Sequence, residues 1–158
     1  MSIKLVNQEN LRKKLRPLVG ILASELTKLI PEAVVEEVGS SSIQGCLTKG
    51  DVDFLVIVSK SNFNVARDRL VEFYEINDMD FIEYFESFKG KREGVDIGIQ
   101  LCVNDNPFGF LIFKKAMTAS PKLVDDYNKI KIEAKGLDVD EYRKAKNKFI
   151  ESVIKNYS

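Results

Sequence analysis

The sequence predicts an α/β (α+β) fold, in which helices pack on a mixed β-sheet and further helices follow at the C-terminal end. Three observations support this prediction. The second half of residues 51–58 is apolar on both faces, which is typical of a central strand covered by helices on each side. Residues 95–103 alternate between apolar and less apolar side chains, as a half-buried strand does. Beyond Pro107 the apolar residues recur only with helical spacing.

The length of the chain favours a single domain. With 158 residues, of which 44% are hydrophobic, the chain can bury one ordinary core, whereas two separate domains would each be marginal. We therefore expect one domain over residues 1–158. Its core should cover about 31–104, and its C-terminal helical region about 107–158.

The first part of the chain is predicted to begin with a long amphipathic helix. Leucines recur at helical spacing over residues 8–30, although Pro17 should kink this helix or restart it. The β-branched residues within 33–38 predict a short strand. A Gly-Ser-rich turn is expected at 39–42, followed by a short helix that ends near Gly50.

The second part is predicted to contain a helix over 61–74 and a strand over 80–88 that leads into a charged turn at 89–94. The alternating strand described above comes next. A Ser-Pro pair and a glycine then divide the remaining chain into three helices. These are expected over roughly 108–118, 121–135 and 139–156.

The composition excludes several kinds of active site. The chain has no histidine, which rules out Ser-His-Asp triads and zinc or haem sites with histidine ligands. Its two cysteines are too few for a disulfide framework, so a reducing compartment is expected. The N-terminus lacks the apolar region of a signal peptide, and no apolar run is long enough to span a bilayer. We therefore expect a cytoplasmic protein that does not associate with membranes.

The charged residues cancel overall but are unevenly distributed. The formal net charge is 0, which disfavours long nucleic acid as a partner. Residues 31–113 are net acidic, whereas residues 1–30 and 114–158 are net basic. An acidic centre between basic segments is what a site for metal ions and a polyphosphate requires.

A glycine-serine turn is the first part of the predicted site. It lies between a predicted strand and a predicted helix, where backbone N–H groups and the helix dipole favour a phosphate. Serine hydroxyls can donate to phosphate oxygens, and lysines can neutralise their charge. The candidate phosphate-binding and nucleotide-binding residues are Gly39, Ser40, Ser41, Ser42, Lys49, Lys131 and Lys146.

Three carboxylates are the second part of the predicted site. Asp51 and Asp53 project from one face of the same strand and could hold Mg²⁺ or Mn²⁺ between them. Asp96, on the less apolar face of a later strand, could complete the set of catalytic and metal-binding residues. Two metals roughly 3.5–4 Å apart stabilise the attacking and leaving oxygens of an in-line displacement. Asp51 and Asp53 would then bridge both metals, and Asp96 would bind the metal at the acceptor hydroxyl and accept its proton.

These motifs resemble the GrpB-like branch of the nucleotidyltransferase superfamily. The resemblance implies a nucleotidyltransferase-type fold, a phosphate turn at Gly39 and Ser40, and metal carboxylates at Asp51 and Asp53, with Asp96 on the strand that usually supplies the third. The segments that carry it are VGSSSIQG at 38–45, KGDVD at 49–53, PKLVDDYNKIK at 121–131 and YRKAKNKFI at 142–150.

The sequence therefore predicts a Mg²⁺-dependent nucleotidyltransferase that moves a nucleoside monophosphate from a nucleoside triphosphate to a hydroxyl acceptor. Two other functions stay open. A nucleotide-binding module without turnover would have the same motifs, and so would an antitoxin-like partner of another protein with the same fold. The sequence identifies neither the base, nor the acceptor, nor the oligomeric state.

Overall fold

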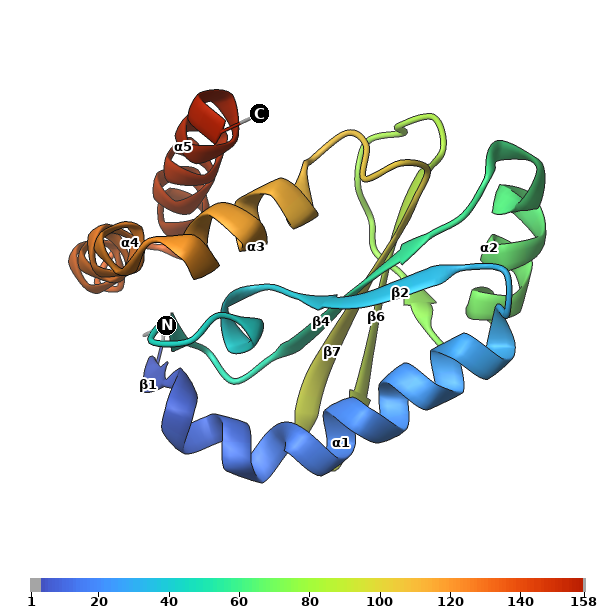
Figure 1. The fold of residues 1–158 in the computed structure, drawn as a ribbon, viewed down its shortest axis with the longest axis horizontal. Helices are drawn as coiled ribbons and strands as arrows, with labels where there is room; N and C mark the ends of the chain where they lie inside the picture. Colours follow the sequence, from blue (N-terminus) through green and yellow to red (C-terminus); the bar gives the residue numbers. More distant parts are fainter. Residues whose placement is uncertain (1–3, 158) are drawn as a thin grey trace.

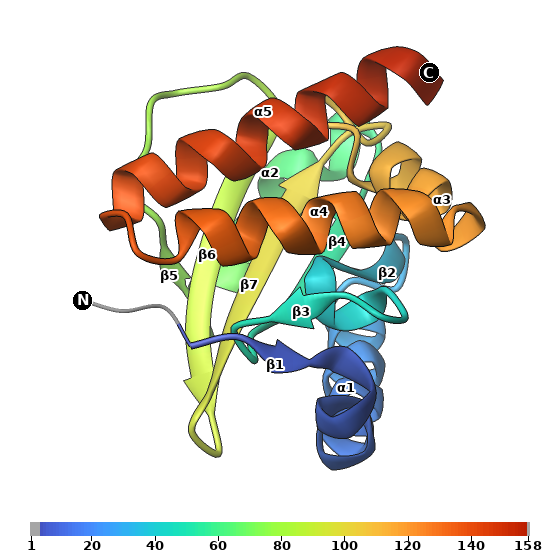
Figure 2. The ribbon, with the colours of Figure 1, turned by 90° about the vertical axis from the view of Figure 1, so that its left-hand side faces the viewer.

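A five-stranded mixed sheet separates two groups of helices in the computed structural model, which describes residues 4–157 (Figure 1). Two helices cover one face of the sheet, and three C-terminal helices lie over the other face (Figure 2). This arrangement confirms the predicted α/β class with C-terminal helices. The helices are α1 (Gln8–Leu29), α2 (Phe63–Val71), α3 (Phe110–Ala119), α4 (Pro121–Ala134) and α5 (Val139–Tyr157).

The strand order in the main sheet is β2-β4-β7-β6-β5, and only β4 and β7 pair in parallel. A small separate sheet pairs β1 with β3. The register places Asp53 between Val38 of β2 and Gly98 of β7. The strands are β1 (Val6–Asn7), β2 (Val34–Val38), β3 (Leu47–Thr48), β4 (Val52–Ile57), β5 (Glu75–Ile76), β6 (Phe85–Arg92) and β7 (Val95–Cys102).

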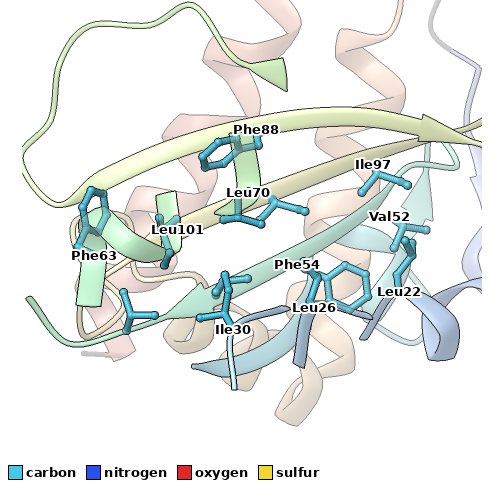
Figure 3. Packing of buried hydrophobic residues seen from close by; sticks show 14 of the residues in the cluster. Leu22, Leu26, Ile30, Val52, Phe54, Phe63, Leu70, Phe88, Ile97 and Leu101 are labelled. Carbon is cyan, nitrogen blue, oxygen red and sulfur yellow. The ribbon is translucent and has the colours of Figure 1, made fainter. Parts of the chain in front are cut away.

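The main hydrophobic core lies between the sheet and helices α1 and α2 (Figure 3). Leu22 and Leu26 of α1 and Leu70 of α2 are almost fully buried against Phe54 and Ile99 of the central strands. Burial of such side chains is the main favourable contribution to folding, at about 1.5–3 kcal/mol each. The core therefore fixes one face of the sheet and leaves the other face for the site.

The segment around the predicted short helix differs from the prediction. Instead of a helix ending near Gly50, the chain forms a single 3₁₀ turn, η1 (Ser40–Ser42), followed by β3. Gly45 and Gly50 have φ values of 84° and 94°, which a continuing helix does not allow.

Helix α1 continues through Pro17 and does not restart there, because its leucines pack on the core on both sides of the proline.

The hairpin between β6 and β7 also differs from the prediction. The expected strand over 80–88 begins only at Phe85 and extends to Arg92, so the expected turn at 89–94 is reduced to Glu93 and Gly94. Both turn residues have positive φ, of 52° and 79°, as a two-residue hairpin turn requires.

Among the described residues, no helix is both long enough and apolar enough to cross a membrane.

Candidate functional site

A cavity of about 940 Å³ lies between the second face of the sheet and the C-terminal helices. Strands β4, β6 and β7 contribute side chains to it from one side, and α4 and α5 contribute from the other. Most of the predicted site residues, although far apart in the sequence, meet in this cavity. They are Gly39, Ser40, Lys49, Asp51, Asp53, Lys131 and Lys146.

Asp53 lies between two glycines whose missing side chains make room for its carboxylate. A Cβ atom on Gly39 would come within 2.5 Å of Asp53 Oδ2, and one on Gly98 would clash with Oδ1. Gly39 also has a φ of 79°, in the region that favours glycine. The Gly39 turn and β7 therefore both need glycine for Asp53 to face the cavity.

Several charged side chains act on the buried carboxylate of Asp53. Burial and the neighbouring Asp51 carboxylate raise the pKa of Asp53 to about 7, and Lys146 and Lys49 act in the opposite direction. Two carboxylates that repel each other in this way favour a bound cation. The pair could hold Mg²⁺, because proteins usually bind this ion through one or two carboxylates together with substrate phosphates and water.

The structure does not bring Asp96 to this pair. Its side chain is 73% exposed and forms an ion pair with Lys91 of β6 at 3.5 Å. It lies on the cavity side of β7, but Asp53 is paired with Gly98, two residues further along that strand. Asp96 does not line the cavity, and no group of three His, Cys, Asp or Glu side chains within residues 4–157 is arranged to hold a metal.

Two of the three predicted serines hold the turn together and do not line the cavity. The Ser41 hydroxyl is buried, 2.8 Å from Thr48 Oγ1, and donates a hydrogen bond to the Asp51 carbonyl. The Ser42 hydroxyl donates to the Gly39 carbonyl at 2.7 Å. These bonds fix the turn next to the carboxylates and leave the third serine to face the cavity.

Lys131 is a buried cation at the wall of the cavity. Only 2% of it is exposed, and burial lowers its pKa to about 8. Its Nζ donates to Ser40 Oγ and to the Leu47 carbonyl, both at 2.5 Å, and lies 4.2 Å from the centre of the Tyr127 ring. The ion pairs of the described residues do not include Lys131. The hydrogen-bond partners of its ammonium group are therefore neutral, and Asp51 stabilises the charge only from beyond ion-pair distance.

Helix α5 brings a second lysine to the same place. Burial lowers the pKa of Lys146, the nearby Lys49 lowers it further, and Asp51 and Asp53 raise it. Lys146 Nζ also lies 5.3 Å from the centre of the Tyr142 ring. Positive charges from α5 and from the loop before β4 thus meet close to the two carboxylates, where an anion would reduce their repulsion.

Asn128 connects α4 to the loop that follows the turn, a role that the sequence did not reveal. Its Oδ1 accepts a hydrogen bond from the Leu47 N–H at 2.9 Å, and its Nδ2 donates to the Gly45 carbonyl at 2.9 Å. Asn128 lies one helical turn before Lys131, so both side chains leave the same face of α4. The spacing of Asn128 and Lys131 was the only sign in the sequence that the two residues act on the same loop.

The end of the cavity away from Lys131 is apolar, and the sequence did not predict it. Phe85, Phe108 and Phe110 form a chain of edge-to-face contacts, with ring centres 4.9 Å and 5.9 Å apart. Gln100 of β7 lies on the same sheet face as Asp53 and lines the cavity. The sequence predicted the residues after Pro107 only as part of a helix over 108–118, and it gave no sign that they meet Phe85.

The stability of the protein is expected to fall as the pH rises from about 4 to about 7. The carboxyl of Asp53 has a pKa of 3.8 in the unfolded chain and of about 7 in the folded chain. Between these values the folded chain binds one proton more than the unfolded chain. Asp53→Asn should remove this dependence and raise the free energy of unfolding at pH 8 by on the order of 1–3 kcal/mol. Urea denaturation at pH 4 and pH 8 measures both effects. Equal pH dependence in the variant and the wild type would contradict the assignment.

Comparison with known sequences gives a family match over nearly the whole chain. The family described as GrpB protein matches residues 7–156. The UPF0157 protein VC_A0354 of Vibrio cholerae is 33% identical over 138 residues, which cover 82% of this chain and 70% of that protein.

Comparison with solved structures gives the same fold. GrpB from Enterococcus faecalis superposes with a TM-score of 0.70 at 18% identity, covering 98% of this chain and 99% of that one. The Cid1 poly(U) polymerase bound to MgGTP superposes with a TM-score of 0.61 at 14% identity, covering 89% of this chain and 50% of the polymerase. Cid1 in complex with the UTP analogue UMPNPP gives a TM-score of 0.54 at 15% identity, over 80% of this chain and 40% of that one. The fold is therefore nucleotidyltransferase-like, and the chain spans half or less of the Cid1 chains.

Proposed function

The chain belongs to the GrpB family and has a nucleotidyltransferase-like fold, and on these grounds we propose that it is a Mg²⁺-dependent nucleotidyltransferase. It would transfer a nucleoside monophosphate from a nucleoside triphosphate to a hydroxyl acceptor. One observation carries the proposal: the buried cation of Lys131 and the carboxylates of Asp51 and Asp53 line one cavity beside the Gly39 turn.

The buried charge of Lys131 supports a bound polyphosphate. A buried ammonium group is costly unless it is paired with an opposite charge, and here its partners are a hydroxyl, a carbonyl and an aromatic ring. Phosphate oxygens entering the cavity would bring negative charge into direct contact with the ammonium group, whereas Asp51 acts on it only from a greater distance. Ser40 and Lys146 line the same cavity, so the β- and γ-phosphates would lie against these three side chains.

The carboxylates would hold the metal. Asp51 and Asp53 would bind Mg²⁺ together with the substrate phosphates, an arrangement that suits a site with two carboxylates. When bound, the ion supplies Lewis-acid stabilisation of the charge that develops on the phosphate oxygens. The two glycines beside Asp53 would keep its carboxylate in the cavity before substrate arrives.

The residues of the cavity would position the reacting groups. The acceptor oxygen forms a bond to the α-phosphorus while the bond from that phosphorus to the bridging oxygen breaks, which releases pyrophosphate. The hydroxyl proton would pass to solvent water, because Asp96 does not line the cavity. Lys131 and Lys146 would stabilise the charge on the departing pyrophosphate, because both cations lie where the leaving phosphates would be held. Positioning and charge stabilisation account for most catalysis of this type.

A nucleotide-binding module without turnover is a second candidate. The position of Asp96 favours it, because this third carboxylate lies outside the cavity. Binding would still use Lys131, Ser40 and the carboxylate pair. The two functions therefore differ in pyrophosphate release and not in nucleotide affinity.

Calorimetry with each of the four common nucleoside triphosphates, with and without Mg²⁺, tests the proposal. We expect at least one of them to bind with a Kd below about 1 mM, which corresponds to about 4 kcal/mol, and to bind more weakly without Mg²⁺. Pyrophosphate release during a screen of hydroxyl acceptors then identifies an enzyme. Binding without release supports the second candidate, and no binding of any triphosphate overturns both.

A further inference from the structure

The cavity has two chemically different ends. Lys131, Ser40 and the carboxylates form the charged end, as described above. At the other end, Phe85, Phe108 and Phe110 lie in edge-to-face contact. Ile150 and Ile154 of α5 line the same cavity. A ligand that fills the cavity therefore needs an anionic end and an apolar end.

The apolar end also contains polar groups that can recognise a ring edge. Gln100 lines the cavity, and its amide makes no hydrogen bond to another of the described residues. Ser87, its neighbour across the β6–β7 pair, is 7% exposed and accepts a hydrogen bond from Asn77 Nδ2 at 2.8 Å, which leaves the hydroxyl hydrogen for a ligand. Both side chains lie on the face of the sheet that lines the cavity, as Phe85 of β6 does.

We infer that the apolar end is the binding site of the nucleobase, with Phe108 as the stacking residue and Gln100 as the group that reads the base edge. This inference rests on the proposed function and specifies which part of the substrate lies where. Phe108 is suited to stacking because 41% of it is exposed, whereas Phe85 behind it is 5% exposed. The Gln100 amide offers a donor and an acceptor side by side, the pattern that nucleobase edges match.

The dimensions of the cavity agree with a whole nucleotide. Its volume of about 940 Å³ lies within the range of sites that enclose a small ligand. Gln100 is two residues from Gly98 on β7, and Gly98 is paired with Asp53, so the Cα of Gln100 lies about 7 Å along the strand from the residue beside Asp53. Its amide turns back toward Gly98, since a Cβ atom on that glycine would lie 3.7 Å from Gln100 Nε2. The base would thus lie beyond the α-phosphate, opposite the phosphates that Lys131 and Ser40 would hold.

The test compares a nucleoside triphosphate with inorganic tripolyphosphate, which has the same phosphates and no base. Calorimetry in Mg²⁺ should show that the wild type binds its best triphosphate at least about 10-fold more tightly than tripolyphosphate. Phe108→Ala and Gln100→Leu should each remove most of this difference while leaving tripolyphosphate affinity within about 2-fold. Phe81→Ala is the matched control, since Phe81 is 89% exposed and does not line the cavity.

The outcomes separate this inference from the proposed function. If tripolyphosphate binds as tightly as every triphosphate, or if Phe108→Ala and Gln100→Leu weaken both ligands equally or neither, the base site is wrong and the phosphate site stands. An unchanged triphosphate affinity in both variants, which is one of these outcomes, would also mean that the aromatic end is available to the acceptor. If neither tripolyphosphate nor any triphosphate binds, the proposed function and the base site both fail.

Discussion

Replacing Asp53 with asparagine is expected to lower the affinity for a nucleoside triphosphate in Mg²⁺ by about 100-fold or more. Substitution of groups that only orient metal ligands already costs 10–100-fold, and Asp53 would be a ligand itself. The amide keeps the shape of the side chain between Gly39 and Gly98, so the loss would come from charge and not from packing. Calorimetry with and without Mg²⁺ measures it, because the variant should bind equally weakly in both conditions.

Asp96→Asn is the matched control for this experiment. It removes one carboxylate from the same face of the sheet, at an exposed position outside the cavity. Its triphosphate affinity should stay within about 2-fold of the wild type, because exposed ion pairs such as that with Lys91 contribute little. A large loss of triphosphate affinity in Asp96→Asn would indicate that Asp96 belongs to the metal site. Triphosphate binding that still depends on Mg²⁺ in Asp53→Asn would contradict the assignment of Asp51 and Asp53 as metal ligands.

Replacing Lys131 with methionine is expected to weaken triphosphate and tripolyphosphate binding by about 10- to 100-fold, without loss of stability. A hydrogen bond from a charged group to phosphate is worth about 1.5–3 kcal/mol, which sets this range. Burial disfavours the ammonium group, but the substitution also removes its hydrogen bonds to Ser40 Oγ and the Leu47 carbonyl. These two effects oppose each other, so the melting temperature should change little. Calorimetry and thermal denaturation measure the two effects.

The same substitution should change how stability depends on pH above neutrality. The pKa of Lys131 falls from 10.5 to about 8 on folding, so the folded chain loses this proton first and stability rises between those values. Lys131→Met should lack this rise. Lys129→Met, at an exposed position on the same helix, should keep both the rise and the wild-type affinity. Parallel losses of affinity in the two variants would point to general electrostatics instead of a specific contact.

The fold and half of the site could be predicted because their signals are local. The alternation over β7 and the apolar run in β4 identified the central strands, and the three C-terminal helices lie within a few residues of their predicted bounds. Gly39 and the Asp51–Asp53 pair lie within 15 residues of sequence, so strand and turn geometry brings them together. The family comparison agrees with these local signals.

The remaining parts of the site depend on contacts that local patterns do not determine. Alternation gave the correct face for Asp96 but not its position relative to β4, since only the register shows that Gly98 lies beside Asp53. The roles of Asn128 and of the aromatic end arise from helices that return to the sheet after the strands are complete. Within a single helix, the spacing of these residues is the same as that of residues that only pack in a core.

The ties between α4 and the Gly39–Thr48 region have a consequence for the order of folding. Four hydrogen bonds that involve Asn128 or Lys131 join positions 81 to 91 residues apart. Contacts of such high sequence separation form only after a long loop has closed, which is slow compared with local helix formation. During synthesis the sheet can therefore assemble before α4 docks, and the Gly39–Thr48 region gains these four hydrogen bonds only after α4 has been translated.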